Sequence, residues 1–410
     1  MRRRFRVESC HRMPIMKTFP QDPSLSSSPL PTGTQAFTHG TLAALVAFAA
    51  ITPLQLLVAP AVAGQLGTQL GLTASQIGAY FFIELGAFSA ATLPSYLWLG
   101  RIDARRVAWW ACAIFCVGNL ATAVLMPGFV PLLALRAATA LGGGTLMVLC
   151  MTSAAMSEHS ERVYGLWVVG QLIAGAAGLF VLPHLFNAVG LRALYGVLAA
   201  LTLCAAPLAG HFPATPRARR PRARTAGPHA ARALAALAVA GILTFYLAIG
   251  GVWTFASRAA AAAGFDASAT GNVLAIASLT GIAGAALASG LGGRASRRAM
   301  LYAGYGILAV SLALLAAAPG PAGYVAAIFG FKFSWTFVLP FMLASVAAVD
   351  ASGRLIATLN LVIGCGLAAG PLIAGLMLDG GGTLRALFAL AAGVSIVSLA
   401  TLLRVERDAR

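Results

Sequence analysis

The sequence predicts an all-α membrane protein with twelve transmembrane helices in two pseudo-symmetric six-helix bundles. Of its 410 residues, 59% are hydrophobic and only 10% are charged, whereas about a quarter of the residues of a soluble domain are charged. The apolar residues form twelve stretches of about 20 residues, the length that crosses the hydrocarbon core of a bilayer. The longest polar interior segment, 211–232, divides these stretches into six and six.

Charged and turn-forming residues separate the twelve stretches. Short turns at 126–128 and 319–321 join the third stretch to the fourth and the ninth to the tenth, so each of these pairs is expected to be antiparallel. The predicted spans are 40–63, 76–99, 107–126, 129–152, 163–186, 190–209, 233–256, 267–291, 299–318, 322–347, 354–377 and 382–403.

Basic residues set the expected orientation, because cytoplasmic loops of membrane proteins are enriched in Lys and Arg. Of the 28 basic residues, 23 fall in the two tails and in the loops that follow even-numbered spans. Arg192, Arg258 and Arg385 fall on the opposite side, and Arg136 and Lys332 fall within spans. We therefore expect a multi-pass protein of the plasma membrane (the inner membrane in bacteria) with both termini in the cytoplasm.

The distribution of these charges also bears on partners and domains. Short arginine clusters between apolar runs indicate that the net charge of +17 faces lipid headgroups and not nucleic acid. The expected parts are a disordered cytoplasmic N-terminal tail (1–38), an N-terminal six-helix bundle (39–210), a basic cytoplasmic linker (211–232), a C-terminal six-helix bundle (233–404) and a cytoplasmic tail (405–410).

The two halves contain similar sequence segments at corresponding positions. Segment 100–106 after the second span and segment 293–298 after the eighth both contain glycine and paired arginines, and they lie about 193 residues apart. Internal repeats of this kind are typical of secondary transporters, whose substrate site lies between the repeats. The repeat therefore favours a carrier over a channel.

Three sequence motifs bear on the family of this protein. Gly100, Asp103, Arg105 and Arg106 form a loop of glycine, acid and clustered basic residues after the second span. In the fourth span, Arg136 is followed by the glycines 142–144. The fifth span carries Gly170, Gly175 and Gly178 without a Gly-Pro pair, which appears instead in the eleventh span as Gly370–Pro371.

These motifs resemble those of the major facilitator superfamily, over about residues 38–404. The loop motif departs from the family pattern, because Gly100 lies one residue late and the second glycine is absent. The resemblance implies that spans 1, 4, 7 and 10 line a central cavity that opens alternately to the two sides. It also implies a cytoplasmic gating role for Gly100, Asp103, Arg105 and Arg106.

Three ionisable residues lie well inside predicted spans: Glu84, Arg136 and Lys332. An ionisable side chain at the bilayer centre costs about 2.5–3.5 kcal/mol on insertion scales, which makes each a candidate functional residue. At 1.5 Å per residue, all three lie roughly 10–15 Å below the outer boundary. Glu84 is the only carboxylate deep in a span, and it has two interpretations: a proton carrier, or one half of a structural ion pair with Arg136.

Lys332 has three interpretations: contact with substrate, neutralisation of Glu84, or extension of its ammonium group to the interface. Two cations facing one acid make the expected cavity positive, which favours an anionic substrate. Trp253, Phe333 and Trp335 are candidates for stacking on a planar substrate, although packing in the core is the alternative for each. Substrate and cavity candidates are therefore Arg136, Lys332, Trp253, Phe333 and Trp335.

The expected function is secondary active transport of a small organic solute by alternating access, as symport or antiport, with organic (aromatic) anions as the favoured class. The alternatives are efflux of drugs or hydrophobic compounds by proton antiport, a transporter-derived sensor, or a channel. No catalytic motif, metal-ligand spacing or phosphate-binding loop occurs, so we expect no enzyme activity, no cofactor and no bound metal. Expected partners are the solute, protons if transport is coupled to them, and the bilayer; we expect a monomer.

Overall fold

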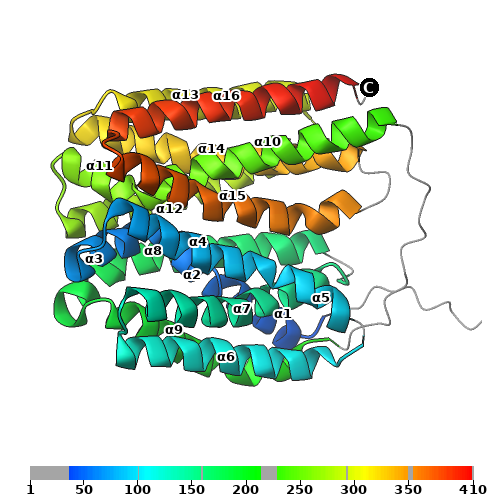
Figure 1. Cartoon of the computed structure of the whole chain (residues 1–410). Coiled ribbons are helices and arrows are strands. Elements are labelled where there is room, and N and C mark those ends of the chain that lie inside the picture. Colours follow the sequence, from blue (N-terminus) through cyan, green and yellow to red (C-terminus); the bar gives the residue numbers. More distant parts are fainter. Residues whose placement is uncertain are drawn as a thin grey trace, which may run out of the picture. The chain divides into compact units, whose positions relative to one another are not determined.

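The computed structural model describes residues 37–99, 101–157, 160–213, 229–291, 294–349 and 354–408. Long helices that run side by side make up this part of the chain (Figure 1). In chain order, they are α1 (His39–Ile51), α2 (Leu54–Leu57), α3 (Ala59–Leu70), α4 (Ala74–Ala90), α5 (Thr92–Trp98), α6 (Ala104–Leu125), α7 (Phe129–Ala154), α8 (Ser160–Val189), α9 (Arg192–Ala205), the 3₁₀ helix η1 (Ala206–His211), α10 (His229–Thr254), α11 (Ala256–Ala262), α12 (Ala267–Leu291), α13 (Arg297–Ala316), α14 (Pro321–Val349), α15 (Arg354–Asp379) and α16 (Leu384–Asp408).

Eleven helical segments in this described part are long and apolar enough to cross a membrane. They match predicted spans 2 to 12 to within about five residues, and 267–291 has the same bounds in both. The predicted first span corresponds to three consecutive helices, α1, α2 and α3. The expected all-helical membrane fold is confirmed.

Two prolines account for the breaks in the first span. A proline has no backbone N–H, and its ring clashes with the carbonyl four residues earlier in a regular helix. Pro53 lies between α1 and α2, and Pro60 lies in the first turn of α3. Because residue 60 is proline, the carbonyl of Leu56 lacks the N–H donor that a helix supplies four residues later. The short α2 therefore carries a carbonyl that lacks its usual helical donor and can accept a hydrogen bond from another helix.

Glycines 142–144 allow α7 to approach two neighbouring helices closely. A Cβ added at Gly142 would lie 3.0 Å from the carbonyl oxygen of Ala111 in α6, and one added at Gly144 would collide with the carbonyl of Phe88 in α4. Small residues at such contacts are typical of packed membrane helices. These glycines hold α7 against α4 and α6, and thereby fix the position of Arg136 on α7.

Helices of the two predicted halves pack along each other in two pairs, α4 with α15 and α8 with α12. The C-terminus lies at one end of the helices, which we term the tail end, and α3 and α11 lie toward the opposite, far end (Figure 1). At the far end, the Asp379 carboxylate accepts hydrogen bonds from the backbone N–H groups of Ala74 (3.0 Å) and Ser75 (2.8 Å). The first turn of α4 is thus tied to the last turn of α15.

One contact occurs in both predicted halves. Arg105 Nε donates to the Phe212 carbonyl (3.1 Å), and Arg298 Nη2 donates to the Glu406 carbonyl (3.0 Å). Each arginine follows the second span of its half and binds the end of the sixth. Glu406 is buried and also accepts from Arg297 and Ser345, and α16 continues through it to Asp408. Residues 405–408, expected as tail, are therefore helical.

Candidate functional site

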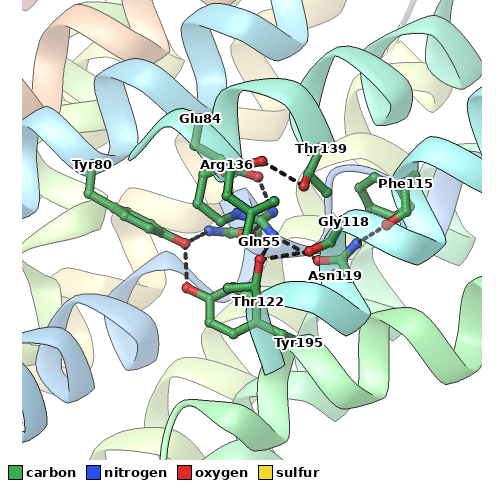
Figure 2. Close-up of polar contacts among 11 residues, drawn as sticks. Gln55, Tyr80, Glu84, Phe115, Gly118, Asn119, Thr122, Arg136, Thr139 and Tyr195 are labelled. Atoms are coloured by element: carbon green, nitrogen blue, oxygen red, sulfur yellow. Dashed lines mark hydrogen bonds and ion pairs between the residues drawn. The ribbon is translucent and has the colours of Figure 1, made fainter. Parts of the chain in front are cut away.

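The first charged site is the ion pair of Arg136 and Glu84 (Figure 2). Arg136 on α7 is fully buried, and Glu84 on α4 is 5% exposed. Arg136 Nε donates to Glu84 Oε2 (2.8 Å), and Nη2 donates to Oε1 (2.6 Å). This bidentate geometry is the strong form of a charge-assisted hydrogen bond. Each buried charge is therefore compensated by the other.

Polar side chains from two other helices complete the coordination of Arg136. Nη1 donates to Asn119 Oδ1 (2.9 Å) and to Thr122 Oγ1 (3.5 Å), both on α6. Nη2 also donates to Gln55 Oε1 (3.0 Å) on α2. A guanidinium group has five N–H donors, and these contacts with those to Glu84 account for all five. In this conformation Arg136 has no donor left for a substrate.

Two buried tyrosines flank the same group. The guanidinium lies 4.9 Å from the centre of the Tyr195 ring, and the hydroxyls of Tyr195 and Tyr80 are 2.7 Å apart. The Gln55 amide nitrogen donates to the Tyr80 hydroxyl. Gln55 therefore joins α2, in the broken first span, to both Arg136 and Tyr80 (Figure 2).

Lys332 on α14 forms a second charged site with a different environment. Its side chain is 2% exposed, and Nζ lies 4.1 Å from the Trp253 ring centre and 4.3 Å from that of Trp335. Among the described residues, no carboxylate lies within ion-pair distance of this ammonium group. Lys332 is thus a buried cation held by two indole rings. The interpretation that it neutralises Glu84 does not hold here, because Arg136 occupies both Glu84 oxygens.

The two indoles, termed here the tryptophan cage, are fixed by further aromatic contacts. Trp253 stacks on Phe331 (6.5 Å between ring centres), and Trp335 lies edge-to-face against the same Phe331 ring (6.3 Å). Phe333, also predicted to face the substrate, instead stacks on Phe337 (5.5 Å), and its carbonyl lies beside Gly284 of α12. The structure therefore brings Trp253 and Trp335 to Lys332, but not Phe333.

The two charged sites occupy corresponding places in the repeat. Lys332 follows Arg136 by 196 residues, close to the 193-residue offset of the arginine loops. Positions 193 to 196 residues after Glu84 are residues 277–280, which are Ala, Ser, Leu and Thr. The C-terminal half thus keeps the intramembrane cation and lacks the acid.

The predicted gating loop is described only in part. Gly100 lies outside the described residues. The Asp103 carboxylate caps α6 by accepting from the backbone N–H of Arg105 (3.2 Å), and the Arg105 side chain binds Phe212. Arg106 is exposed. In this conformation Asp103 and Arg105 make contacts within the N-terminal half, and the gating role remains a prediction.

A cavity of about 640 Å³ opens between the two halves at the far end. Its walls come from both halves, with Gln65 and Asn187 on one side and Arg258 and Thr270 on the other. Neither Lys332 nor Glu84 lines it. The cavity therefore lies apart from the two buried charged sites.

Sequence reasoning missed the uncharged polar partners. Gln55, Asn119, Tyr80 and Tyr195 are buried around the ion pair, as Tyr246 is beside the tryptophan cage. An available signal was an amide side chain within an otherwise apolar span, since a buried amide requires hydrogen-bond partners.

The sequence profile described as Major Facilitator Superfamily matches residues 41–352, about three quarters of the chain. The chain belongs to the major facilitator superfamily. It is therefore a multi-pass membrane transporter and not an enzyme. No individual sequence among the curated proteins matches it significantly.

Solved structures of other transporters share the fold. The nucleoside transporter NupG aligns with a TM-score of 0.67 at 13% identity, covering 90% of this chain and 99% of that chain. A D-xylose-proton symporter aligns with a TM-score of 0.67 at 14% identity, covering 88% and 96%. At such identities the likeness is one of fold, and the substrate has to be inferred from this chain's own residues.

Proposed function

We propose that this secondary transporter carries small organic anions, aromatic ones included, and that Lys332 binds their anionic group. The observation that carries the proposal is the buried ammonium group, which has no carboxylate partner among the described residues. The plasma membrane and a cytoplasmic location of both termini remain part of this proposal.

Electrostatics favours an anion at this position. Burying a cation is costly unless a partner compensates it. Cation–π contacts contribute about 0.5–2 kcal/mol, so the tryptophan cage compensates the charge only in part. A substrate anion supplies an ionic hydrogen bond of about 1.5–3 kcal/mol. This corresponds to roughly 10- to 100-fold in affinity, since 1.4 kcal/mol is tenfold.

The cage also favours an aromatic body on that anion. Planar rings stack in offset or edge-to-face arrangements on indole. Trp253 and Trp335 present their ring faces to one ammonium group and lie at 71° to each other. A planar acid that binds Lys332 therefore meets two indole rings beside the ammonium group.

We further propose that protons drive transport through Glu84. Both Glu84 oxygens accept hydrogen bonds from Arg136 in this conformation, and a proton on Glu84 would cancel the negative charge that Arg136 pairs with. Arg136 is also held by Gln55 on the short α2. A movement of α2 would change the partners of Arg136, and through them the availability of Glu84.

The test is transport by the purified chain in liposomes with an imposed proton gradient. The solutes are benzoate, succinate, uridine, xylose and the hydrophobic cation ethidium. We expect saturable transport of an acid, reduced at least about tenfold in Lys332→Gln and retained in part in Lys332→Arg. Transport of uridine, xylose or ethidium that is unchanged in Lys332→Gln would refute the proposal, and non-saturating flux would indicate a pore.

A further inference from the structure

The geometry points to Trp253 as a positioning residue that links the anion site at Lys332 to the Arg136–Glu84 pair through the short helix α2. The inference rests on the proposed role of Lys332 as the anion-binding residue. It is carried by a continuous series of contacts from one charged site to the other, which crosses between the two halves.

The first contact in the series is the hydrogen bond between Trp253 and Leu56. Trp253 Nε1 donates to the Leu56 carbonyl (3.1 Å), which joins α10 in the C-terminal half to α2 in the N-terminal half. Leu56 is the residue whose helical donor is lost because residue 60 is proline. The indole N–H therefore donates to a carbonyl that has lost its usual helical donor at the break in the first span.

The second contact runs from the other side of α2. Gln55, adjacent to Leu56, accepts from Arg136 Nη2 (3.0 Å) and donates to Tyr80. The four-residue α2 is thus held by the ion pair on one side and by Trp253 on the other. A shift of α2 therefore changes the contacts of both the Arg136–Glu84 pair and Trp253.

The third contact connects the series to Lys332. The ammonium group lies over the face of the same indole whose N–H binds Leu56. An anion that binds Lys332 draws the ammonium group away from this face, because an ionic contact is stronger than a cation–π contact. The indole is then less constrained, its bond to Leu56 weakens, and α2 is released from the C-terminal half. Release of α2 from the C-terminal half would in turn favour anion binding at Lys332, because thermodynamic coupling between two sites is reciprocal.

Two residues provide matched controls. Trp335 contacts the same ammonium group at 4.3 Å, but its ring packs on Trp253 and Phe331 of its own half. Ser257 Oγ donates to the Pro60 carbonyl (2.8 Å) across the same junction, and it is not among the residues that contact Lys332. Trp335→Phe therefore changes the cage while keeping the Trp253 N–H that binds Leu56, and Ser257→Ala removes a junction contact without changing the cage.

The test needs no ligand, because Lys332→Gln itself removes the ammonium group from the indole. Hydrogen–deuterium exchange of the amides at 54–58 is measured in the full chain in lipid nanodiscs. We expect Trp253→Phe, which keeps a ring and loses the N–H, to speed this exchange about fivefold, the effect of one lost hydrogen bond. Lys332→Gln is expected to speed it in the wild-type, Trp335→Phe and Ser257→Ala backgrounds, and to add nothing in Trp253→Phe.

The absence of a Lys332→Gln effect in the Trp253→Phe background distinguishes a positioning role of Trp253 from a general loosening of the fold. If Trp253→Phe only loosened the fold, Lys332→Gln would still speed the exchange of α2 in that background. Exchange of α2 that is unchanged in Trp253→Phe, or an equal effect of Lys332→Gln with and without Trp253, overturns the inference. If that happens while Lys332→Gln still abolishes anion transport, the proposed function stands. If the effects are non-additive but no anion is transported, the link stands and the proposed function fails.

Discussion

Replacing Arg136 with methionine is expected to destabilise the protein by about 3–5 kcal/mol, because a buried ion pair that loses one partner leaves an uncompensated charge. The variant keeps side-chain length and leaves Glu84 buried without its bidentate partner. It also removes the donors to Asn119 and Gln55. The measurement is the thermal unfolding midpoint of the purified protein in detergent.

The control for this effect is the double variant Glu84→Gln/Arg136→Met, in which no unpaired charge remains at the site. We expect it to be more stable than Arg136→Met alone, because it removes the isolated carboxylate. Equal midpoints for wild type and Arg136→Met would contradict the view that this pair holds α4 and α7 together.

Replacing Glu84 with glutamine is expected to abolish proton-driven accumulation of substrate while leaving membrane insertion intact. Glutamine has nearly the same shape and still accepts a hydrogen bond from Arg136, but it cannot release a proton. The measurement compares accumulation under an imposed proton gradient with solute exchange at equal pH on both sides. Loss of the first with retention of the second identifies Glu84 as the coupling residue.

Full proton-driven accumulation by Glu84→Gln would leave Glu84 only its structural role beside Arg136. Lys332→Gln is the matched variant, because it removes the buried charge of the second site. We expect it to reduce exchange and accumulation together, since it acts on substrate binding and not on the coupling ion.

Much of the fold was predictable because membrane spans follow from length and composition alone. The turn at 126–128 and the arginine loops placed the neighbouring spans correctly, and α7 begins at Phe129 as expected. The first span was predicted as one helix. Its breaks depend on Pro53 and Pro60, whose effect on a membrane helix is decided by whether a neighbour satisfies the freed carbonyls.

The site was predictable at the level of single residues. Each charge in an apolar span marked an unusual position, and Glu84, Arg136 and Lys332 are all buried. Their pairing was not predictable, because three charges at a similar depth permit several combinations. Contacts through Gln55 and Leu56 connect residues from four different spans, and only the packing of the helices shows which of them meet.

The most direct measurement of the central claim is the affinity of the purified protein for a transported acid and for its uncharged amide. The account predicts that wild type binds the acid at least about tenfold more tightly and that Lys332→Gln loses this preference. Equal affinities of wild type for acid and amide, or a preference that persists in Lys332→Gln, would contradict it.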